Sequence, residues 1–271
     1  MRQQHCVVNR LRIGGGAPVR LMGVINCSPE SFYRGSYIPA GDVYDRALAM
    51  TAAGADMIDL GARSTAPGSS PITVAEEAAR VNAALSELDG TGITLSVDTR
   101  NAEVLEAALR HDVHAVNDIS GLADEHYAKV VANAGLPVFA MASFREPGDA
   151  VGFAATKDAL ETVVSRCAHL GIEEYVLDPA VGRWVSERTS EDDWELCRNF
   201  TSFLDFGRPM LAAVSRKTFI GDLLGRQPED RLAGTLAVTT MLVSAGAAIV
   251  RSHDVAETAD LLRVHATMRQ I

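Results

Sequence analysis

The pattern of apolar and polar residues divides the chain into short and long segments that alternate from one end to the other. Short runs rich in Val, Ile, Leu and Met end at a polar residue or a glycine, and each precedes a longer stretch with the apolar period of a helix. The short runs predict eight strands, at 20–25, 57–60, 93–97, 115–117, 137–141, 175–177, 209–214 and 248–250. The long stretches predict helices at 42–53, 74–88, 102–110, 125–134, 156–170, 192–203, 230–246 and 255–269.

The spacing of these elements favours one closed barrel. Strand starts recur about every 32 residues, which is the length of a strand–helix unit. Strands that alternate with helices imply a parallel sheet with right-handed crossovers, and eight such units imply a (β/α)₈ TIM barrel rather than an open sheet. No linker or low-complexity tract divides the 271 residues. We therefore predict a single α/β domain that spans residues 1–271.

The segment 7–13 alternates apolar and polar residues and precedes three glycines, Gly14 to Gly16. This pattern predicts a short N-terminal hairpin that would close the bottom of the barrel. The glycines resemble a phosphate-binding loop only superficially, because they precede the first barrel strand and so lie at the end opposite the active site. A turn is the better interpretation.

Composition and charge exclude several classes of function. The chain is 47% apolar and 22% charged, as in ordinary soluble proteins, and no run of eighteen apolar residues suggests a membrane span. A net charge of −10 without a basic stripe argues against nucleic-acid partners. The first residues show no signal peptide, and the four scattered cysteines, with no C-x-x-C pair, favour reduced thiols in the cytoplasm. Cys27 is interpreted as a buried thiol rather than a nucleophile.

Polar and ionisable residues gather where the predicted strands end. In a TIM barrel the active site lies at the carboxyl ends of the strands. Seven of the eight predicted ends carry such a residue, and their convergence on one mouth favours a binding site over seven separate capping roles. From strand to strand the residues at the ends are Asn26, Asp59, Asp98, Asn117, Met141, Asp178, Ser215 with Lys217, and Arg251 with His253.

The distribution of these groups indicates the substrate class. Asp98, Asn117 and Asp178 follow the third, fourth and sixth strands, whereas Lys217 and Arg251 follow the last two, where barrels often hold phosphate; His253 is a further candidate cation there. Ionised carboxylates only accept hydrogen bonds, so the ligand should present an amino-amidine edge. A polar heterocycle attached to a phosphate or diphosphate fits both sides. Asp59 fits a structural role inside the barrel better.

Seven ordered motifs, each at a predicted strand end, resemble the dihydropteroate synthase family from about residue 21 to residue 255. The family's opening pattern, M-G-(I/V)-(L/I)-N-x-(T/S)-P-(D/E)-S-F, reads MGVINCSPESF at 22–32. Its second signature reads GADMIDLGARSTAPG at 54–68. The others are SVDT at 96–99, NDISG at 117–121, LDP at 177–179, SRKTFIG at 215–221 and RSHDV at 251–255.

The resemblance implies a role for each matched residue. Asp178 would accept from the 2-amino and N3 edge of a dihydropterin ring, and Lys217 would reach its O4/N5 edge. Arg251 would flank the ring and hold the diphosphate together with His253 and Asn26. The complete implied substrate-binding set is Asn26, Thr65, Asp98, Asn117, Met141, Asp178, Ser215, Lys217, Arg251 and His253. Met141 is expected to pack against the ring.

The implied reaction is substitution at the exocyclic methylene of 6-hydroxymethyl-7,8-dihydropterin diphosphate, in folate or related pterin biosynthesis. Diphosphate leaves and an arylamine attacks, so charge builds on the pterin, and the implied catalytic residues are Lys217, Asp98 and Arg251. The family resemblance also implies a Mg²⁺ ion with Asn26 as its contact, since Mg²⁺ favours oxygen ligands and substrate phosphates. A homodimer is expected by analogy with the family.

The chain departs from the family pattern after the first, second, fifth and sixth strands. These departures introduce arginines on the side where the family binds the arylamine: Arg34, Arg63, Arg145 and Arg183. One interpretation is that the amine is p-aminobenzoate in a modified form with extra negative charge, such as a phosphate. The other is that these arginines are solvated loop charges.

Two further functions remain open at this point. A pterin-dependent methyltransferase shares the barrel and the ring pocket but has no use for a diphosphate site, so the residues at 215–217 and 251–253 favour the synthase. A non-catalytic pterin-binding paralogue is made plausible by the altered loops.

Overall fold

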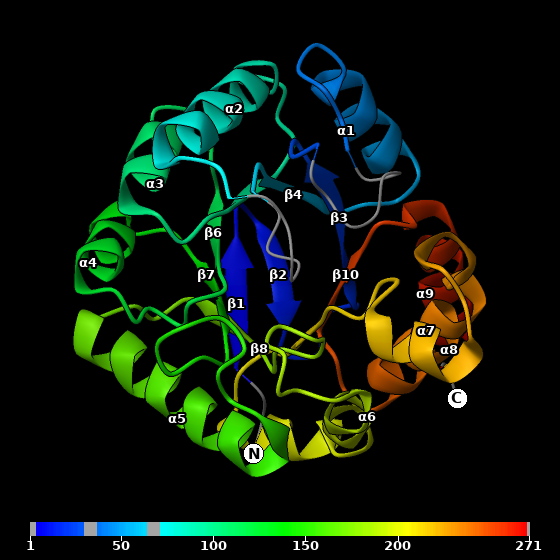
Figure 1. Ribbon diagram of the computed structural model, residues 1–271. Helices are drawn as coiled ribbons and strands as arrows, with labels where there is room; N and C mark the ends of the chain where they lie inside the picture. The colour runs from blue at the N-terminus through cyan, green and yellow to red at the C-terminus, as the bar shows by residue number, and fades with distance from the viewer. Residues whose placement is uncertain (1–3, 30–36, 64–70, 270–271) are drawn as a thin grey trace.

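Eight parallel strands form a barrel in the computed structural model, which describes residues 4–29, 37–63 and 71–269 (Figure 1). The barrel strands are β3 (Arg20–Asn26), β4 (Met57–Gly61), β5 (Leu95–Asp98), β6 (Ala115–Asp118), β7 (Val138–Met141), β8 (Tyr175–Asp178), β9 (Leu211–Ala212) and β10 (Ile249–Ser252). Neighbours in the sheet follow the order β8-β7-β6-β5-β4-β3-β10-β9. Each of the eight predicted strands is present, and the predicted TIM barrel is confirmed.

The barrel closes between β8 and β9. Leu177 and Met210 form a parallel bridge there, and the amide of Leu177 donates to the carbonyl of Pro209 at 2.9 Å. The strand predicted at 209–214 is only two residues long, Leu211–Ala212. A ladder thus runs from β8 through β3 to β9, and this single bridge completes the ring.

A ring of helices surrounds the strands (Figure 1). The helices are α1 (Val43–Ala52), α2 (Val74–Ser86), α3 (Ala102–Ala108), α4 (Glu125–Ala134), α5 (Gly152–Leu170), α6 (Ser190–Arg198), α7 (Thr218–Leu224), α8 (Leu232–Ser244) and α9 (Val255–Arg269). Eight match the predicted helices, and α7 was not predicted. Parallel strands covered in this way are buried on both faces, as all five residues of β4 are.

Four helices, α1, α5, α6 and α8, start one to four residues away from their predicted positions. Helix α5 begins four residues early, because Glu195 of α6 accepts from the amide of Phe153 at 3.2 Å, a contact that periodicity does not reveal. Helix α6 begins at Ser190, where the side chain of Thr189 caps the amide of Asp192 and Asp192 returns the bond. The chain beyond α6 continues as a 3-10 helix over Phe200–Phe206 instead of one long α-helix.

The N-terminal hairpin consists of β1 (His5–Val8) and β2 (Leu11–Gly14) and lies at the centre of the barrel in Figure 1. Cys6, Val8 and Ile13 are fully buried against the residues that begin the barrel strands, so the hairpin closes the bottom as predicted. Gly14 has a φ of +76°, and a Cβ there would lie 2.9 Å from Pro209 Cγ. The glycine run is therefore a turn packed against the barrel.

Two further observations concern the helices and the cysteines. Among the described helices, none combines the length and apolarity that crossing a bilayer requires. The four cysteines are free thiols, and Cys6, Cys27 and Cys167 are buried.

Candidate active site

A cavity of about 500 Å³ opens at the carboxyl ends of the strands. The strand ends are where parallel β/α folds place their ligands. Of the residues predicted from sequence, those that line it are Asn26, Asp98, Asn117, Asp178, Ser215, Lys217, Arg251 and His253. Residues up to 227 positions apart in the chain thus share one pocket. Asn26 comes from β3, and the others come from β5, β6, β8, β10 and the loops after β9 and β10.

Arg251 is held at the floor of the cavity by two carboxylates. Its Nε donates to Asp59 Oδ2 at 2.7 Å, and its Nη2 donates to Asp98 Oδ2 at 3.0 Å. Asp59 is fully buried and also accepts from Asn117 Nδ2 at 2.8 Å and from the hydroxyl of Ser96. Asp59 therefore orients two pocket residues without lining the pocket, which agrees with the structural role expected for it.

Asp98 has an unusual protonation equilibrium. Burial raises the pKa of Asp98 to about 7, with a further contribution from the neighbouring Asp59, while Arg251 opposes the shift. Burial alone would lower the pKa of Arg251, but Asp59 and Asp98 raise it, so Arg251 stays a cation. Asp98 is thus able to change its charge near neutral pH, whereas its partner is not.

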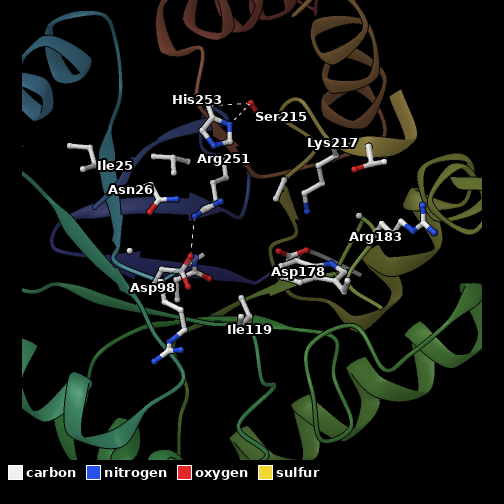
Figure 2. A pocket seen from close by; sticks show the side chains of 18 of the residues that line it. Ile25, Asn26, Asp98, Ile119, Asp178, Arg183, Ser215, Lys217, Arg251 and His253 are labelled. Carbon is white, nitrogen blue, oxygen red and sulfur yellow. Dashed lines mark hydrogen bonds and ion pairs between the residues drawn. The ribbon is translucent and has the colours of Figure 1, made fainter. Parts of the chain in front are cut away.

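Lys217 and Asp178 face each other across the cavity in Figure 2. Lys217 is the residue before α7, and its Nζ donates to the carbonyl of Val181 and lies 4.9 Å from the ring centroid of Trp184. Burial lowers the pKa of Lys217 to about 8, against the attraction of Asp178. Burial likewise raises the pKa of Asp178, whose Oδ1 accepts from the amide of Ala180 at 2.8 Å.

His253 is paired with Ser215 at the end of the site beside Arg251 (Figure 2). Its Nδ1 lies 2.9 Å from Ser215 Oγ, and its amide donates to the same oxygen at 3.2 Å. Burial, and then the nearby Arg251, lower the pKa of His253 to about 3. His253 is therefore a neutral imidazole near pH 7 and not the cation considered from sequence, so it can contribute one N–H donor but no charge.

Asn26 lies at the rim, at the end of β3. Its Oδ1 accepts from the amide of Ser28 at 2.9 Å, which fixes the side chain. The parts of the chain that the structure describes hold no cluster of three or more His, Cys, Asp or Glu side chains suited to a metal ion.

Two of the remaining predicted residues, Met141 and Arg145, are not among those that line this pocket. Thr65 and Arg34 lie outside the described residues. Met141 is 1% exposed and belongs to the hydrophobic core rather than to the cavity lining. Arg145 is exposed and lies away from the cavity lining.

Two of the arginines introduced by the altered loops do line the cavity. Arg63 is engaged by Glu77, with Nε 2.5 Å from Oε2, and by the carbonyl of Ile72. Arg183 is exposed at the mouth. Of these two arginines, Arg183 is the one whose guanidinium has no carboxylate partner among the described contacts.

Sequence reasoning missed Ile119 and Trp184, both of which line the cavity. Ile119 follows Asn117 by two positions, so strand alternation was a signal that could have identified it. Trp184 carries a weaker signal, as a large aromatic residue in a polar loop. Its Nε1 donates to the carbonyl of Ala180 at 2.9 Å, and a Cβ on Gly148 would lie 1.9 Å from Trp184 Cβ. The missing side chain at Gly148 thus makes room for this aromatic wall.

The arrangement can bind a ligand of two-sided polarity. Asp178, Asn117 and Asp98 offer acceptors and an amide on one side, and Lys217 and Arg251 offer positive charge on the other, inside a partly apolar chamber. A ring with N–H donors fits the first side, and an anionic group fits the second. Charge that develops in a reaction would be stabilised by side chains that are already held in place and do not have to reorient.

Comparison with known proteins gives a consistent result. A family model described as pterin binding enzyme matches residues 22–253. A dihydropteroate synthase of Mycobacterium leprae is 34% identical over 266 residues, covering 92% of this chain and 93% of that protein. A probable bifunctional folylpolyglutamate synthase/dihydropteroate synthase of Haloferax volcanii is 34% identical over 259 residues, so this chain spans 30% of that longer relative.

The solved structures agree. The dihydropteroate synthase of Xanthomonas albilineans with 4-aminobenzoic acid superimposes with a TM-score of 0.87 at 30% identity, covering 98% of both chains.

Proposed function

The chain belongs to the dihydropteroate synthase family of pterin-binding enzymes, and on that premise we propose that it joins 6-hydroxymethyl-7,8-dihydropterin diphosphate to an arylamine and releases diphosphate. It is then a transferase of folate or related pterin biosynthesis. The observation that carries this proposal is the two-sided cavity, where Asp178 faces Lys217 and Arg251 lies between Asp59 and Asp98.

We assign the pterin ring to the acceptor side. Asp178 accepts from the 2-amino group and N3, and Asn117 and Asp98 hold the remaining polar edge. Each of these side chains is fixed before the ring arrives: Asp178 by the amide of Ala180, Asn117 by Asp59 and Asp98 by Arg251. Prior fixation lowers the ordering cost of binding, which favours affinity and a single ring orientation.

We assign the diphosphate to the opposite side. Arg251 carries the permanent charge, and the neutral His253, aligned by Ser215, adds one directional donor. A cation that is already braced by two carboxylates stays in place when the diphosphate leaves. The leaving anion is therefore stabilised as its charge grows.

The chemical step needs no side-chain nucleophile. The C–O bond between the exocyclic methylene and the diphosphate breaks, the amine nitrogen forms the new C–N bond, and the amine loses a proton. Asp98 and Asp178 stabilise the positive charge that develops on the pterin. Cys27 does not compete as a nucleophile, because burial raises the pKa of its thiol to about 12.

The residues present fit a Mg²⁺ ion that arrives with the substrate. One rim amide oxygen, on Asn26, is a suitable hard ligand, and the described chain supplies no cage of carboxylates or imidazoles. Mg²⁺ commonly binds through one or two protein ligands with waters and substrate phosphates completing its shell. When bound, the ion would neutralise charge on the diphosphate.

We propose that the second substrate is p-aminobenzoate or a modified relative of it. Arg183 at the mouth supports an amine with extra negative charge, since a guanidinium pairs readily with a phosphate or carboxylate. Arg63 is paired with Glu77, so its guanidinium is not available to bind an anionic group of the amine. Turnover with a set of amines tests this point.

We also propose a homodimer and a cytoplasmic location. Large apolar side chains are exposed on α7, α8 and α9, which lie side by side in Figure 1: Leu223, Leu224, Met241, Val264 and Met268. A surface of this kind favours contact with a second copy. The free cysteines fit a reducing compartment. Sedimentation of the intact protein tests the dimer, and a monomer at all concentrations contradicts it.

The function is tested by diphosphate release. The protein is incubated with dihydropterin diphosphate and an arylamine, and Lys217→Ala serves as the inactive control. Release that depends on both substrates supports the proposal. Binding of the pterin without release would indicate a non-catalytic paralogue.

A further inference from the structure

A buried ion pair lies behind the wall of the cavity and takes no part in the proposed chemistry. Arg188 Nε donates to Asp193 Oδ1 at 2.9 Å, and both side chains are 0% exposed. Neither residue lines the cavity. Desolvating two charges generally costs more than their attraction returns, so an apolar pair of similar volume would stabilise the fold at least as well.

The pairing is also incomplete. Among the described residues, Nη1 and Nη2 of Arg188 and Oδ2 of Asp193 have no hydrogen-bond partner, although all three atoms are buried. Buried polar atoms in native proteins are almost always satisfied, and an exception calls for an explanation. A gain in stability does not explain these unsatisfied atoms. The position of the pair relative to the active site explains them.

Asp193 connects the first turn of α6 to the loop that touches Lys217. The same Oδ1 atom accepts from the amide of Gly182 at 2.7 Å. Gly182 has a φ of +132°, and a Cβ there would lie 2.7 Å from Lys217 Cδ and 2.9 Å from its Nζ. The carbonyl of the preceding residue, Val181, accepts from Lys217 Nζ. One carboxylate therefore fixes the backbone on which the lysine side chain lies.

A second contact joins the same turn of α6 to the backbone of Lys217. Trp194, next to Asp193, packs edge-on against Phe219 with ring centroids 4.6 Å apart. Phe219 lies in the first turn of α7, and Lys217 is the residue that precedes this helix. The start of α6 thus borders both ends of the lysine, its backbone through Phe219 and its ammonium group through Gly182 and Val181.

We propose that Asp193, with Arg188 as its counter-ion, is a positioning residue that holds Lys217 in place opposite Asp178 for binding of the pterin ring. This inference rests on the function proposed above. Asp193 does not touch the substrate. It acts through the loop at 181–182. Burial raises the pKa of Asp193, and Arg188 opposes that shift.

The charges around Lys217 supply a distinctive readout. Asp178 on β8 and Asp193 on α6 raise the pKa of Lys217, whereas burial, Arg251 on β10 and Arg188 lower it to about 8. Trp184 covers the ammonium group with an uncharged face. Removing the charge of Asp193 while keeping its shape should therefore lower the pKa of Lys217 further. A role confined to folding would leave this pKa unchanged.

Three variants separate positioning from stability. Asp193→Asn keeps an acceptor for Gly182, so the KM for the pterin diphosphate should change little while the alkaline limb of kcat/KM moves to lower pH. Asp193→Ala removes the acceptor and should raise that KM about tenfold, the order expected when one hydrogen bond to a charged group is lost. Arg188→Met combined with Asp193→Leu should melt no lower than the original protein yet show the same rise in KM.

The matched control is Glu191→Gln on the same helix. Glu191 pairs with Arg198 at the surface and is 73% exposed, so this change should alter neither KM nor the alkaline limb. A double-mutant cycle completes the test: in the Lys217→Ala background, Asp193→Ala should add no further loss of pterin binding.

Two results would overturn the positioning role. One is an additive loss of pterin binding when Asp193→Ala is combined with Lys217→Ala. The other is an unchanged KM and an unchanged alkaline limb in all three Asp193 variants. Failure of the original protein to bind the pterin diphosphate is a different result, because it contradicts the proposed function itself.

Discussion

Arg251 donates from Nε to Oδ2 of Asp59 at 2.7 Å, although 192 residues separate the two in the chain. Asp59 is completely buried in the middle of β4, and Arg251 extends from β10 into the cavity. The closed barrel brings them together, since β3 pairs with both strands. The permanent cation of the active site is thus attached to the core of the fold, and its direction is set before any ligand binds.

Removing this anchor should damage both stability and activity. Asp59→Ala leaves Arg251 with Asp98 alone and leaves Asn117 Nδ2 without its acceptor, so we expect a loss of about 3 to 5 kcal/mol in the free energy of unfolding. Chemical denaturation measures it. Glu146→Ala, which breaks the exposed pair with Arg100, is the control and should cost less than about 1 kcal/mol. Equal losses in the two variants would show that Asp59 is no anchor.

Loss of the lysine cation should affect catalysis more than folding. Lys217→Met keeps the apolar stem against Gly182 and Trp184 but removes the charge that faces Asp178. We expect kcat/KM for the pterin diphosphate to fall about 100-fold, as when one preorganised electrostatic donor is removed. Steady-state kinetics measures the change, and Lys129→Met at the surface is the matched control. A fall of less than about threefold contradicts the assignment.

The rate should depend on pH as a narrow bell. Burial raises the pKa of Asp98 to about 7, so its carboxylate, which accepts from Arg251 and the ring, is lost as pH falls through that value. Burial lowers the pKa of Lys217 to about 8, so the cation is lost as pH rises through that value. Because kcat/KM reports the free enzyme, both limbs should appear in it. A profile that is flat from pH 6 to pH 9 would falsify the pair of assignments.

The choice of amine should depend on Arg183. Its guanidinium lies at the mouth of the cavity, on the side where the loops depart from the family pattern. We expect a phosphorylated arylamine to exceed p-aminobenzoate at least tenfold in kcat/KM, which corresponds to about 1.4 kcal/mol. Arg183→Ala should remove most of that difference, and Arg145→Ala, which lies away from the cavity, should not. Equal or better use of p-aminobenzoate by the unaltered enzyme contradicts this prediction.

The barrel and the ring side of the site were predictable from sequence because their signals are local. Each strand ends at a polar residue within its own motif, and the barrel then brings these ends together whatever the intervening loops are. Asn117 and Asp178 can therefore be assigned to one pocket from the sequence alone. The N-terminal hairpin was visible for the same reason, as alternation followed by glycines.

The features of the site that could not be predicted from the sequence depend on contacts between distant segments. The neutral state of His253 follows from burial beside Arg251, which no motif states. The position of Met141 in the core depends on how its neighbours pack. The contact of Asp193 with Gly182 spans a loop and a helix cap, so neither period nor spacing indicates it.

We propose that this cavity binds a dihydropterin diphosphate and transfers its pterinylmethyl group to an arylamine. Diphosphate release measured with both substrates, with each one omitted, and with Lys217→Met tests it most directly. We expect release in proportion to the arylamine consumed, none when either substrate is omitted, and a fall of about 100-fold in the variant. Tight pterin binding with no release for any arylamine would contradict it.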